Sequence, residues 1–482
     1  MNDLPFPAAA PESLGIPSAS VSDFVAGLDS LDQAHAFILM RHGKTVAAGE
    51  WKPYSAELPH ELFSLSKSFV SCAIGIAQEE KRLDIRDKVT DFFPEYLSPA
   101  VSPRMRQVTL RDLLMMAGGH DRCAFSFTDF DHGNWIKEIL ESPLLYEPGK
   151  RFVYNSGGTF LLAAVIRKVT GQNVAEYLQS RLFGPLGIAA PEWNRNPQGI
   201  DIGGWGLWLS VKDLAKFGEL LYRKGRLGDR QLVPAAYLAE ATSFQMDNSM
   251  NDAPDWKVGY GYQFWQCRGG GFRGDGACGQ YVVVYPEKGF VFAFVSGLRN
   301  MQEVLTLFQE RILAAAQDAP LPEDPGAARR LEEQLNSLHV PLPEEMRFPL
   351  PPGDFISSPF AGEYRAVPNP WGIGRFALRF TEDACFMETD GLPIRAGFRE
   401  SVHSSVPLSA AAPHEIAARA AWIRPDELMI RAWCLQTPSR FTWHIRFEKD
   451  RATIHRQAPI IFRDSKTDIL FQGIKGDPAP AR

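Results

Sequence analysis

The sequence predicts an α+β fold in which an antiparallel sheet is flanked by a helical region and followed by a C-terminal all-β domain. Two observations support this fold class. Within the first 318 residues, paired strands come first, helices fill the middle and paired strands return, whereas a parallel sheet would alternate strand and helix. Beyond residue 358, apolar and polar residues alternate with the period of a half-exposed strand.

The N-terminal elements follow from their apolar spacing. The runs 37–40 and 45–48 are β-rich and flank the short polar stretch 41–44, which predicts a hairpin. A helix is expected to begin at Ser64, because apolar residues then recur at helical spacing until the polar run 78–82. Ser64 would therefore lie where a loop enters a buried helix.

The middle of the chain predicts a helix and a second hairpin. Ser210 begins a Ser-Val-Lys-Asp sequence typical of a helix N-terminus, and Gly225 marks the expected end of that helix. The runs 281–285 and 290–295 flank Pro286-Glu287-Lys288-Gly289, which predicts a hairpin. A helical segment is expected over 302–316.

Proline enrichment suggests the domain boundary. Prolines cluster between residues 320 and 352, so we expect a first domain over 1–318, a Pro-rich linker over 319–357 and an all-β domain over 358–482. A small barrel is one architecture for this last domain. Its role stays open between a lid, an oligomer contact and a separate binding module.

Composition excludes several classes of partner. The net charge is −6 and Lys and Arg do not concentrate in any segment, so nucleic acid is not an expected partner. No apolar run approaches the roughly 20 residues needed to span a membrane, and the first residues lack a secretory signal. We therefore expect a cytoplasmic protein without a membrane span.

Neither a metal nor a cofactor is expected. The six cysteines are far apart, without a Cys-x-x-Cys pair, and no His-Glu-x-x-His run occurs. Gly269 to Gly274 match a dinucleotide fingerprint, yet a strand is predicted after them where that fold needs a helix.

Ser64 and Lys67 form a Ser-x-x-Lys motif at the start of the first buried helix. Residues three apart share one face of a helix, so the lysine amine can reach the serine hydroxyl. A desolvated lysine has a lowered pKa and can accept the proton that makes serine a nucleophile. By itself the motif also fits an ordinary exposed helix start.

Further motifs follow in a fixed order. Tyr154 lies in Pro148-Gly149-Lys150-Arg151-Phe152-Val153-Tyr154-Asn155-Ser156-Gly157-Gly158, and 273–280 reads Arg-Gly-Asp-Gly-Ala-Cys-Gly-Gln before a strand. The stretches 108–114 and 183–188 and the pair Gly203-Gly204 add matches. Together these segments resemble the serine β-lactamase-like and penicillin-binding protein family, which includes class C β-lactamases, family VIII esterases and 6-aminohexanoate-dimer hydrolases.

The resemblance implies site roles. Ser64 would be the nucleophile, Lys67 and Tyr154 would share general base and acid work, and the backbone N–H groups of Ser64 and Ala277 would form the oxyanion hole. Which of Lys67 and Tyr154 is the base stays open. The candidates for substrate binding are Asn155, Arg273, Asp275, Gly276 and His120.

Two positions depart from the family pattern. The family places Asn two residues after its tyrosine, whereas Asn155 follows Tyr154 directly and Ser156 takes the later position. Gly274 stands where β-lactamases carry a lysine, so recognition of a substrate carboxylate would require Arg273.

These observations predict a metal-free serine hydrolase that cleaves a small-molecule ester or amide, or a short peptide. Small carboxylic esters and short or D-configured amides rank above β-lactams. The alternatives are a penicillin-binding protein, a β-lactamase, and a non-catalytic binder that retains the fold. Several aromatic residues either line an apolar acyl pocket or belong to the core: Trp205, Trp208, Tyr260, Tyr262 and Trp265. The oligomeric state stays open.

Overall fold

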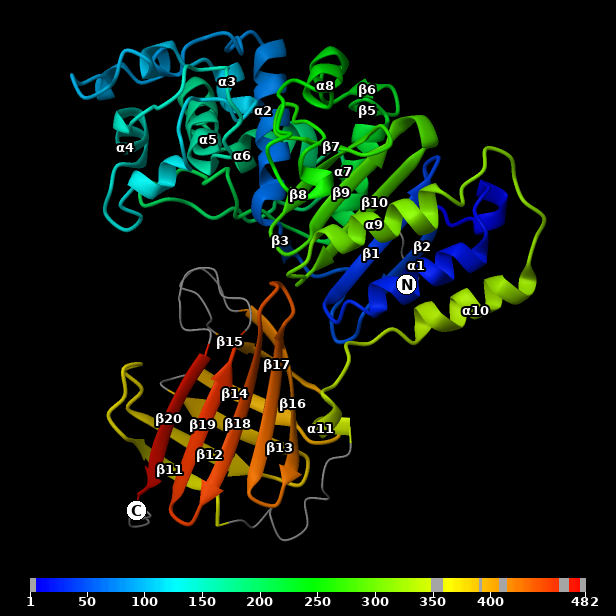
Figure 1. Ribbon diagram of the computed structural model, residues 1–482, viewed down its shortest axis with the longest axis vertical. Helices are drawn as coiled ribbons and strands as arrows, with labels where there is room; N and C mark the ends of the chain where they lie inside the picture. The colour runs from blue at the N-terminus through cyan, green and yellow to red at the C-terminus, as the bar shows by residue number, and fades with distance from the viewer. Residues whose placement is uncertain (1–5, 348–358, 390–391, 407–413, 459–467, 477–482) are drawn as a thin grey trace. The chain divides into compact units, whose positions relative to one another are not determined.

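The computed structural model describes residues 6–347, 359–389, 392–406, 414–458 and 468–476 (Figure 1). The chain divides into two compact units. The first contains Met1–Glu50 with Ala56–Leu338, and the second contains Trp51–Ser55 with His339–Arg482. The predicted fold class is confirmed, because the first unit combines helices with an antiparallel sheet and the second is built from strands.

A six-stranded sheet forms the centre of the first unit, in the order β2-β1-β10-β9-β8-β7. Both predicted hairpins are present, and β1 pairs with β10 so that the first and last strands of the unit are neighbours. The strands are β1 Ala34–Arg41, β2 Lys44–Glu50, β7 Trp265–Cys267, β8 Gly271–Gly276, β9 Gln280–Tyr285 and β10 Phe290–Ser296. Short two-stranded pairings join β3 His60–Glu61 to β4 Trp208–Leu209, and β5 Arg226–Leu227 to β6 Arg230–Gln231.

Helices cover both faces of this sheet, which explains why β1 is buried along its whole length. On one face, Phe24 of α1 packs against Phe37 and Phe292 of the sheet. Figure 1 shows α1 grouped there with α9 and α10. These helices are α1 Ser18–Asp29, α9 Gln302–Leu307 and α10 Pro325–Asn336.

The opposite face carries the helical region that holds the site. Ala36, Ile38 and Met40 of β1 join its core, together with apolar residues of α2, α5 and α7. The helices of this region are α2 Ser66–Glu79, α3 Leu110–Leu114, α4 Trp135–Glu141, α5 Ser156–Thr170, α6 Val174–Leu178, α7 Val211–Tyr222 and α8 Ala235–Ala241. Ser210 caps α7 by accepting a hydrogen bond from the Asp213 N–H, as its position in the sequence predicts.

The boundary between the units lies after Leu338, later than the expected end of the first domain at residue 318. Part of the segment expected as a linker forms α10, which begins with Pro325 and is capped by the Asp324 side chain. Ala327 and Leu331 are buried where α10 packs on α1. Because these apolar residues pack against α1, α10 belongs to the first unit.

The second unit is a ten-stranded sheet closed into a barrel, in the order β14-β13-β12-β11-β20-β19-β18-β17-β16-β15 with an added β14–β16 pairing. Alternate residues such as Phe376, Leu378 and Ile445 face a core within the barrel. The elements are α11 Glu344–Arg347, β11 Gly362–Ala366, β12 Arg375–Phe380, β13 Ala384–Thr389, β14 Leu392–Gly397, β15 Val402–Val406, β16 His414–Arg424, β17 Glu427–Cys434, β18 Arg440–Glu448, β19 Arg451–Gln457 and β20 Asp468–Lys475.

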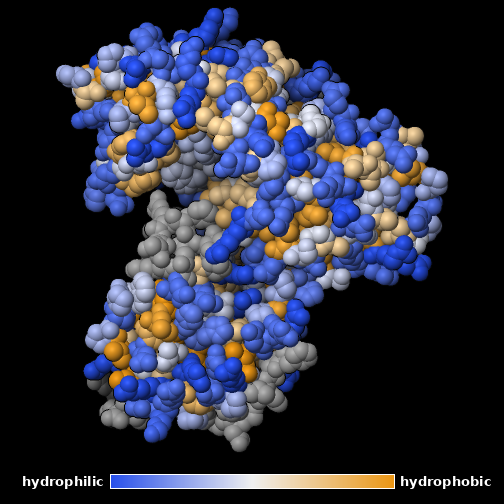
Figure 2. Space-filling model, viewed as in Figure 1, coloured by the Kyte–Doolittle hydropathy of each residue, from blue (hydrophilic) through white to orange (hydrophobic). Residues whose placement is uncertain are grey.

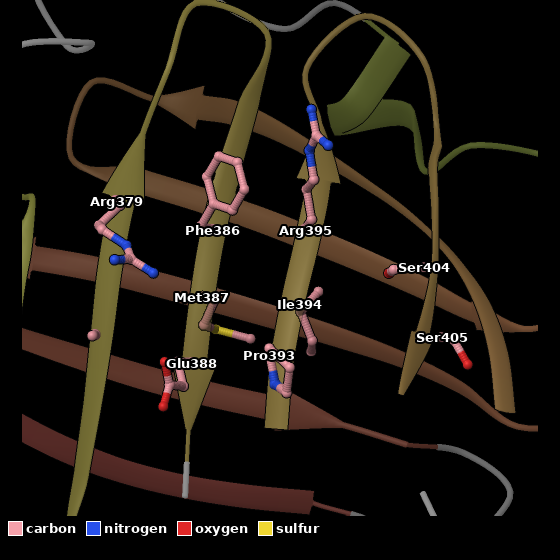
Figure 3. A pocket seen from close by; sticks show the side chains of 10 residues that line it. Arg379, Phe386, Met387, Glu388, Pro393, Ile394, Arg395, Ser404 and Ser405 are labelled. Carbon is pink, nitrogen blue, oxygen red and sulfur yellow. The ribbon is translucent and has the colours of Figure 1, made fainter. Parts of the chain in front are cut away.

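A pocket is lined by residues of four strands of this barrel, β12 to β15 (Figure 3). Arg379, Phe386 and Arg395 come from three neighbouring strands and are direct cross-strand partners. Arg379 and Arg395 are exposed. Hydrophilic residues predominate on the barrel surface that Figure 2 displays, and hydrophobic residues are scattered among them.

Candidate active site

Ser64 lies in a single 3₁₀ turn, Phe63–Leu65, immediately before α2. Phe63 has a φ of 46°, which is uncommon for a non-glycine residue, and it turns the chain sharply before Ser64. The Leu62 N–H donates to the Leu207 carbonyl at 2.9 Å, which fastens this turn to the strand segment at β4. Ser64 is therefore partly exposed at the entrance of a helix that is otherwise deeply buried.

Lys67 lies one helical turn further on and is only 1% exposed. Its Nζ is 3.0 Å from Ser64 Oγ, 3.0 Å from Ser156 Oγ and 2.6 Å from the Gly204 carbonyl oxygen. Burial lowers the pKa of Lys67 to about 7, against the opposing effects of Cys123 and Asp275. A substantial neutral fraction of this amine therefore exists near neutral pH, which a general base requires.

Tyr154 completes a group of three with Ser64 and Lys67. Its hydroxyl is hydrogen-bonded to Ser64, and Lys67 Nζ lies 4.9 Å from the centre of its ring. Burial, followed by the nearby carboxylate of Asp275, raises the pKa of Tyr154 well above its ordinary value. Tyr154 is thus a neutral phenol at physiological pH, able to donate a proton.

Ser156 is a site residue that the sequence analysis did not include among its candidates. It is the first residue of α5, and its hydroxyl accepts a hydrogen bond from Lys67 Nζ. The signal was present, since Ser156 occupies the position where the family pattern places asparagine. A hydroxyl there can hold the lysine amine as an amide oxygen would.

Asn155 was a candidate for substrate binding, and the structure places its side chain elsewhere. Its Oδ1 accepts hydrogen bonds from the N–H groups of Gly157, Gly158 and Ala124 at 3.0 to 3.3 Å. Asn155 therefore caps the N-terminus of α5 and anchors the segment that contains Ala124. It is 5% exposed, so burial also separates this amide from solvent.

Arg273 and Asp275 form a buried ion pair on β8, with Nε 2.9 Å from Oδ2. Arg273 is fully buried, and its Nη1 donates to the Gln266 carbonyl at 3.0 Å. Burial raises the pKa of Asp275, and the adjacent guanidinium lowers it in part. The charge of Arg273 is therefore neutralised within the protein and is not presented to a substrate carboxylate.

The glycines of β8 allow this strand to lie against the segment that carries Ser64. A β-carbon at Gly274 would lie 2.7 Å from Ser68 Oγ, and one at Gly276 would lie 2.0 Å from the Leu62 carbonyl oxygen. Ala277 follows directly in the β8–β9 turn, where its carbonyl accepts from Gln280 Nε2 at 3.1 Å. This close packing brings the backbone of 276–277 beside the turn that contains Ser64.

His120 is buried apart from this group. Its Nε2 lies 2.8 Å from Ser142 Oγ, whose own proton is donated to the Ile139 carbonyl, so His120 Nε2 carries the proton and donates. Burial lowers the pKa of His120 to about 4, so the ring is neutral. Within the described part of the chain, His120 forms no hydrogen bond with Ser64, Lys67 or Tyr154.

The aromatic candidates divide between two environments. Tyr260, Tyr262 and Trp265 are buried, whereas Trp205 and Trp208 are partly buried. Trp265 stacks on Tyr154, with ring centres 5.5 Å apart and planes 25° apart.

Two features were sought among the residues with described positions: a cluster of metal-ligating side chains and a membrane-spanning helix. In these ranges, no three His, Cys, Asp or Glu side chains gather so as to hold a metal ion. Nor does any helix there combine the length and the apolar character that a membrane crossing needs.

Known proteins share parts of this sequence. Penicillin-binding protein 4* of Bacillus subtilis is 28% identical over 200 residues, covering 37% of this chain and 43% of that protein. The 6-aminohexanoate-dimer hydrolase of Paenarthrobacter ureafaciens is 24% identical over 281 residues, covering 54% of this chain and 72% of that protein. Lovastatin esterase of Penicillium rubens is 25% identical over 171 residues, covering 30% of this chain and 42% of that protein. The chain spans less than two thirds of the length of the first curated relatives that it matches.

Structural similarity agrees with the sequence matches. A Bacillus anthracis protein provisionally named a 6-aminohexanoate-dimer hydrolase superimposes with a TM-score of 0.51 at 20% identity, covering 68% of this chain and 88% of that chain. At this identity the likeness concerns the fold alone. The Beta-lactamase family profile matches residues 29–316, which is more than half of the chain. The protein therefore belongs to the beta-lactamase family of serine hydrolases.

Proposed function

We propose that the protein cleaves a carboxylic ester or an amide through an acyl-enzyme on Ser64, without a metal ion. The contact between Lys67 Nζ and Ser64 Oγ at 3.0 Å is the observation that carries this proposal. It joins a partly exposed hydroxyl to a buried amine whose pKa of about 7 leaves it partly neutral. Nucleophile and base are thus within direct proton-transfer distance.

Lys67 is the general base of acylation in this proposal. In its neutral form the amine keeps donor hydrogen bonds to the Gly204 carbonyl and Ser156 Oγ, and its lone pair faces the Ser64 hydroxyl. Tyr154 does not suit this role near neutral pH, because its phenol stays protonated. The environments of the two groups therefore separate the base from the acid.

Acylation transfers the acyl group to Ser64 and leaves Lys67 and Tyr154 in their starting protonation states. Ser64 Oγ forms a bond to the substrate carbonyl carbon while its proton passes to Lys67 Nζ. The bond from that carbon to the leaving oxygen or nitrogen breaks as Tyr154 donates its phenol proton to the leaving group, and Lys67 returns a proton to Tyr154. Water subsequently attacks the acyl-enzyme, releasing the acid and restoring the Ser64 hydroxyl.

The developing oxyanion would be held by the backbone N–H groups of Ser64 and Ala277. The close approach of Gly276 to the Leu62 carbonyl supports this assignment, because it sets β8 beside the nucleophile turn. Fixed donors placed where negative charge develops lower the barrier without reorganisation.

The stretch 273–280 favours substrates that carry no carboxylate beside it. A lysine in place of Gly274 would clash through its β-carbon, and Arg273 is buried in an ion pair with Asp275. We therefore rank small carboxylic esters and short or D-configured amides above β-lactams. Relatives named lovastatin esterase and 6-aminohexanoate-dimer hydrolase are consistent with this ranking.

Hydrolysis of p-nitrophenyl butyrate by the native protein and by Ser64→Ala tests the proposal, with nitrocefin as a parallel substrate. We expect ester turnover in the native protein, loss of at least about 10³-fold in Ser64→Ala, and little or no cleavage of nitrocefin. Faster turnover of nitrocefin would assign a β-lactamase. Absence of turnover and of any covalent adduct would assign a binder instead.

A further inference from the structure

We propose that Trp265 and Arg273 are positioning residues that fix the ring of Tyr154 for proton transfer to the leaving group. This inference rests on the proposed function, in which Tyr154 is the proton donor. It also gives Arg273 a role other than the recognition of a substrate carboxylate.

The observation is a continuous stack of flat and charged groups behind the site. Trp265 lies nearly parallel to Tyr154, with ring centres 5.5 Å apart. The guanidinium carbon of Arg273 lies 5.7 Å from the Trp265 ring centre, and Lys67 Nζ lies 4.9 Å from the Tyr154 ring centre. The Tyr154 ring therefore contacts the catalytic amine and the Trp265 indole, and the indole contacts the guanidinium.

The sheet itself sets this arrangement. Trp265 of β7 and Arg273 of β8 are direct cross-strand partners, so the register of the hairpin places them together. Phe152 and Tyr260 contact the indole edge-on, with ring centres at 5.7 and 4.8 Å. The indole is 6% exposed and is held on several sides.

Arg273 is held as firmly as Trp265. Asp275 binds its Nε, the Gln266 carbonyl binds its Nη1, and Trp256 lies 4.7 Å from its guanidinium carbon. Its Nη2 is buried without a hydrogen bond inside the described ranges, so ring faces supply part of its surroundings. A planar guanidinium suits such a position better than a lysine amine.

Proton transfer depends steeply on position. The phenol hydroxyl is at the far end of the side chain, so a small tilt of the ring moves it away from the leaving atom. A displacement of about 1 Å can cost about 100-fold in rate. Because Trp265 limits the tilt of Tyr154, its loss should resemble a partial loss of the Tyr154 hydroxyl.

This role has a specific kinetic signature. A p-nitrophenolate leaves readily without protonation, whereas an amide nitrogen must be protonated to leave. Mispositioning of Tyr154 should therefore reduce kcat/KM for a p-nitroanilide far more than for the p-nitrophenyl ester of the same acid. A general loss of packing would reduce both to a similar extent.

The experiment compares kcat/KM for p-nitrophenyl butyrate and butyryl p-nitroanilide in a set of variants. Trp265→Met fills the space of the indole but has no flat face. We expect its kcat/KM for the anilide to fall at least about tenfold more than its kcat/KM for the ester. Tyr154→Phe should show the same pattern. The double variant that combines Trp265→Met with Tyr154→Phe should lose little more anilide activity than Tyr154→Phe alone, because the two changes affect the same proton transfer. Trp265→Phe retains a ring and should keep the native ratio within a few-fold.

Two further variants separate positioning from stability. Arg273→Lys keeps the charge beside Asp275 but removes the planar group, and should change the ratio in the same direction as Trp265→Met. Phe24→Leu removes a ring from the core on the opposite face of the sheet, away from Trp265, and should lower the melting temperature while the two substrates change alike. These two variants and Trp265→Phe decide the matter if Trp265→Met does not fold.

Failure of this inference is distinguishable from failure of the proposed function. If the native protein shows no Ser64-dependent hydrolysis, the proposed function is wrong. If hydrolysis depends on Ser64 but Trp265→Met loses ester and anilide activity equally, or its loss adds fully to that of Tyr154→Phe, positioning by Trp265 is refuted.

Discussion

In the proposed mechanism, the buried amine of Lys67 makes the rate of hydrolysis depend on pH. Its pKa is lowered to about 7, chiefly by burial, so the neutral form that accepts the Ser64 proton grows as pH rises through 7. We predict that kcat/KM rises about tenfold per pH unit below this point and levels off above it. Stopped or continuous ester assays from about pH 5 to about 9 measure this profile. A rate that falls as pH rises through 7 would exclude Lys67 as the base.

The same burial lowers the stability of the protein. Below pH 7 Lys67 is charged in the folded and unfolded chains, and the folded state bears the full cost of desolvation. Between about 7 and its ordinary pKa the folded state holds fewer protons, so this cost declines as pH rises. Relative to Lys67→Met, the native protein should thus gain about 3 kcal/mol in unfolding free energy between about pH 6 and about pH 9. Urea titrations that give a pH-independent difference would contradict the lowered pKa.

At the scale of the element, the N-terminus of α5 supports the site. Asn155, which lies between Tyr154 and Ser156 in the sequence, caps this helix. Its Oδ1 also accepts a hydrogen bond from the Ala124 N–H. We expect Asn155→Ala to cost about 2 kcal/mol, because three N–H groups lose their acceptor. Ser210→Ala, which removes the cap of α7, should cost about 1 kcal/mol and serves as the matched control. Equal losses of stability and activity in the two variants would argue against a special role for the α5 cap.

The elements that the sequence predicted correctly are those defined by local turn and capping residues. The hairpins around 41–44 and 286–289 and the helix after Ser210 follow from local turn and capping residues, and all are present. The helix α10 was missed although Asp324 and Pro325 are a typical helix start, because neighbouring prolines suggested a linker. The motifs made Ser64, Lys67 and Tyr154 candidates, and the structure places their side chains together. The contact between Trp265 and Arg273 depends on strand register, which single-sequence patterns do not specify.

For the whole molecule, the described division predicts separate unfolding. The residues assigned to the proposed chemistry belong to the first unit, and the barrel has its own core. We expect two calorimetric transitions, one for each unit. An alkyl fluorophosphonate bound covalently to Ser64 should raise the temperature of one transition and leave the other in place. A single transition that shifts as a whole would show that the units unfold together.

The central claim is that Ser64 carries the acyl group. Mass spectrometry of the intact protein, quenched in acid during turnover of p-nitrophenyl butyrate, tests it most directly. We predict a mass increase of one butyryl group, located by peptide mapping on Ser64 and absent from Ser64→Ala. Hydrolysis that continues in Ser64→Ala, or an acyl group that maps to another residue, would contradict the claim.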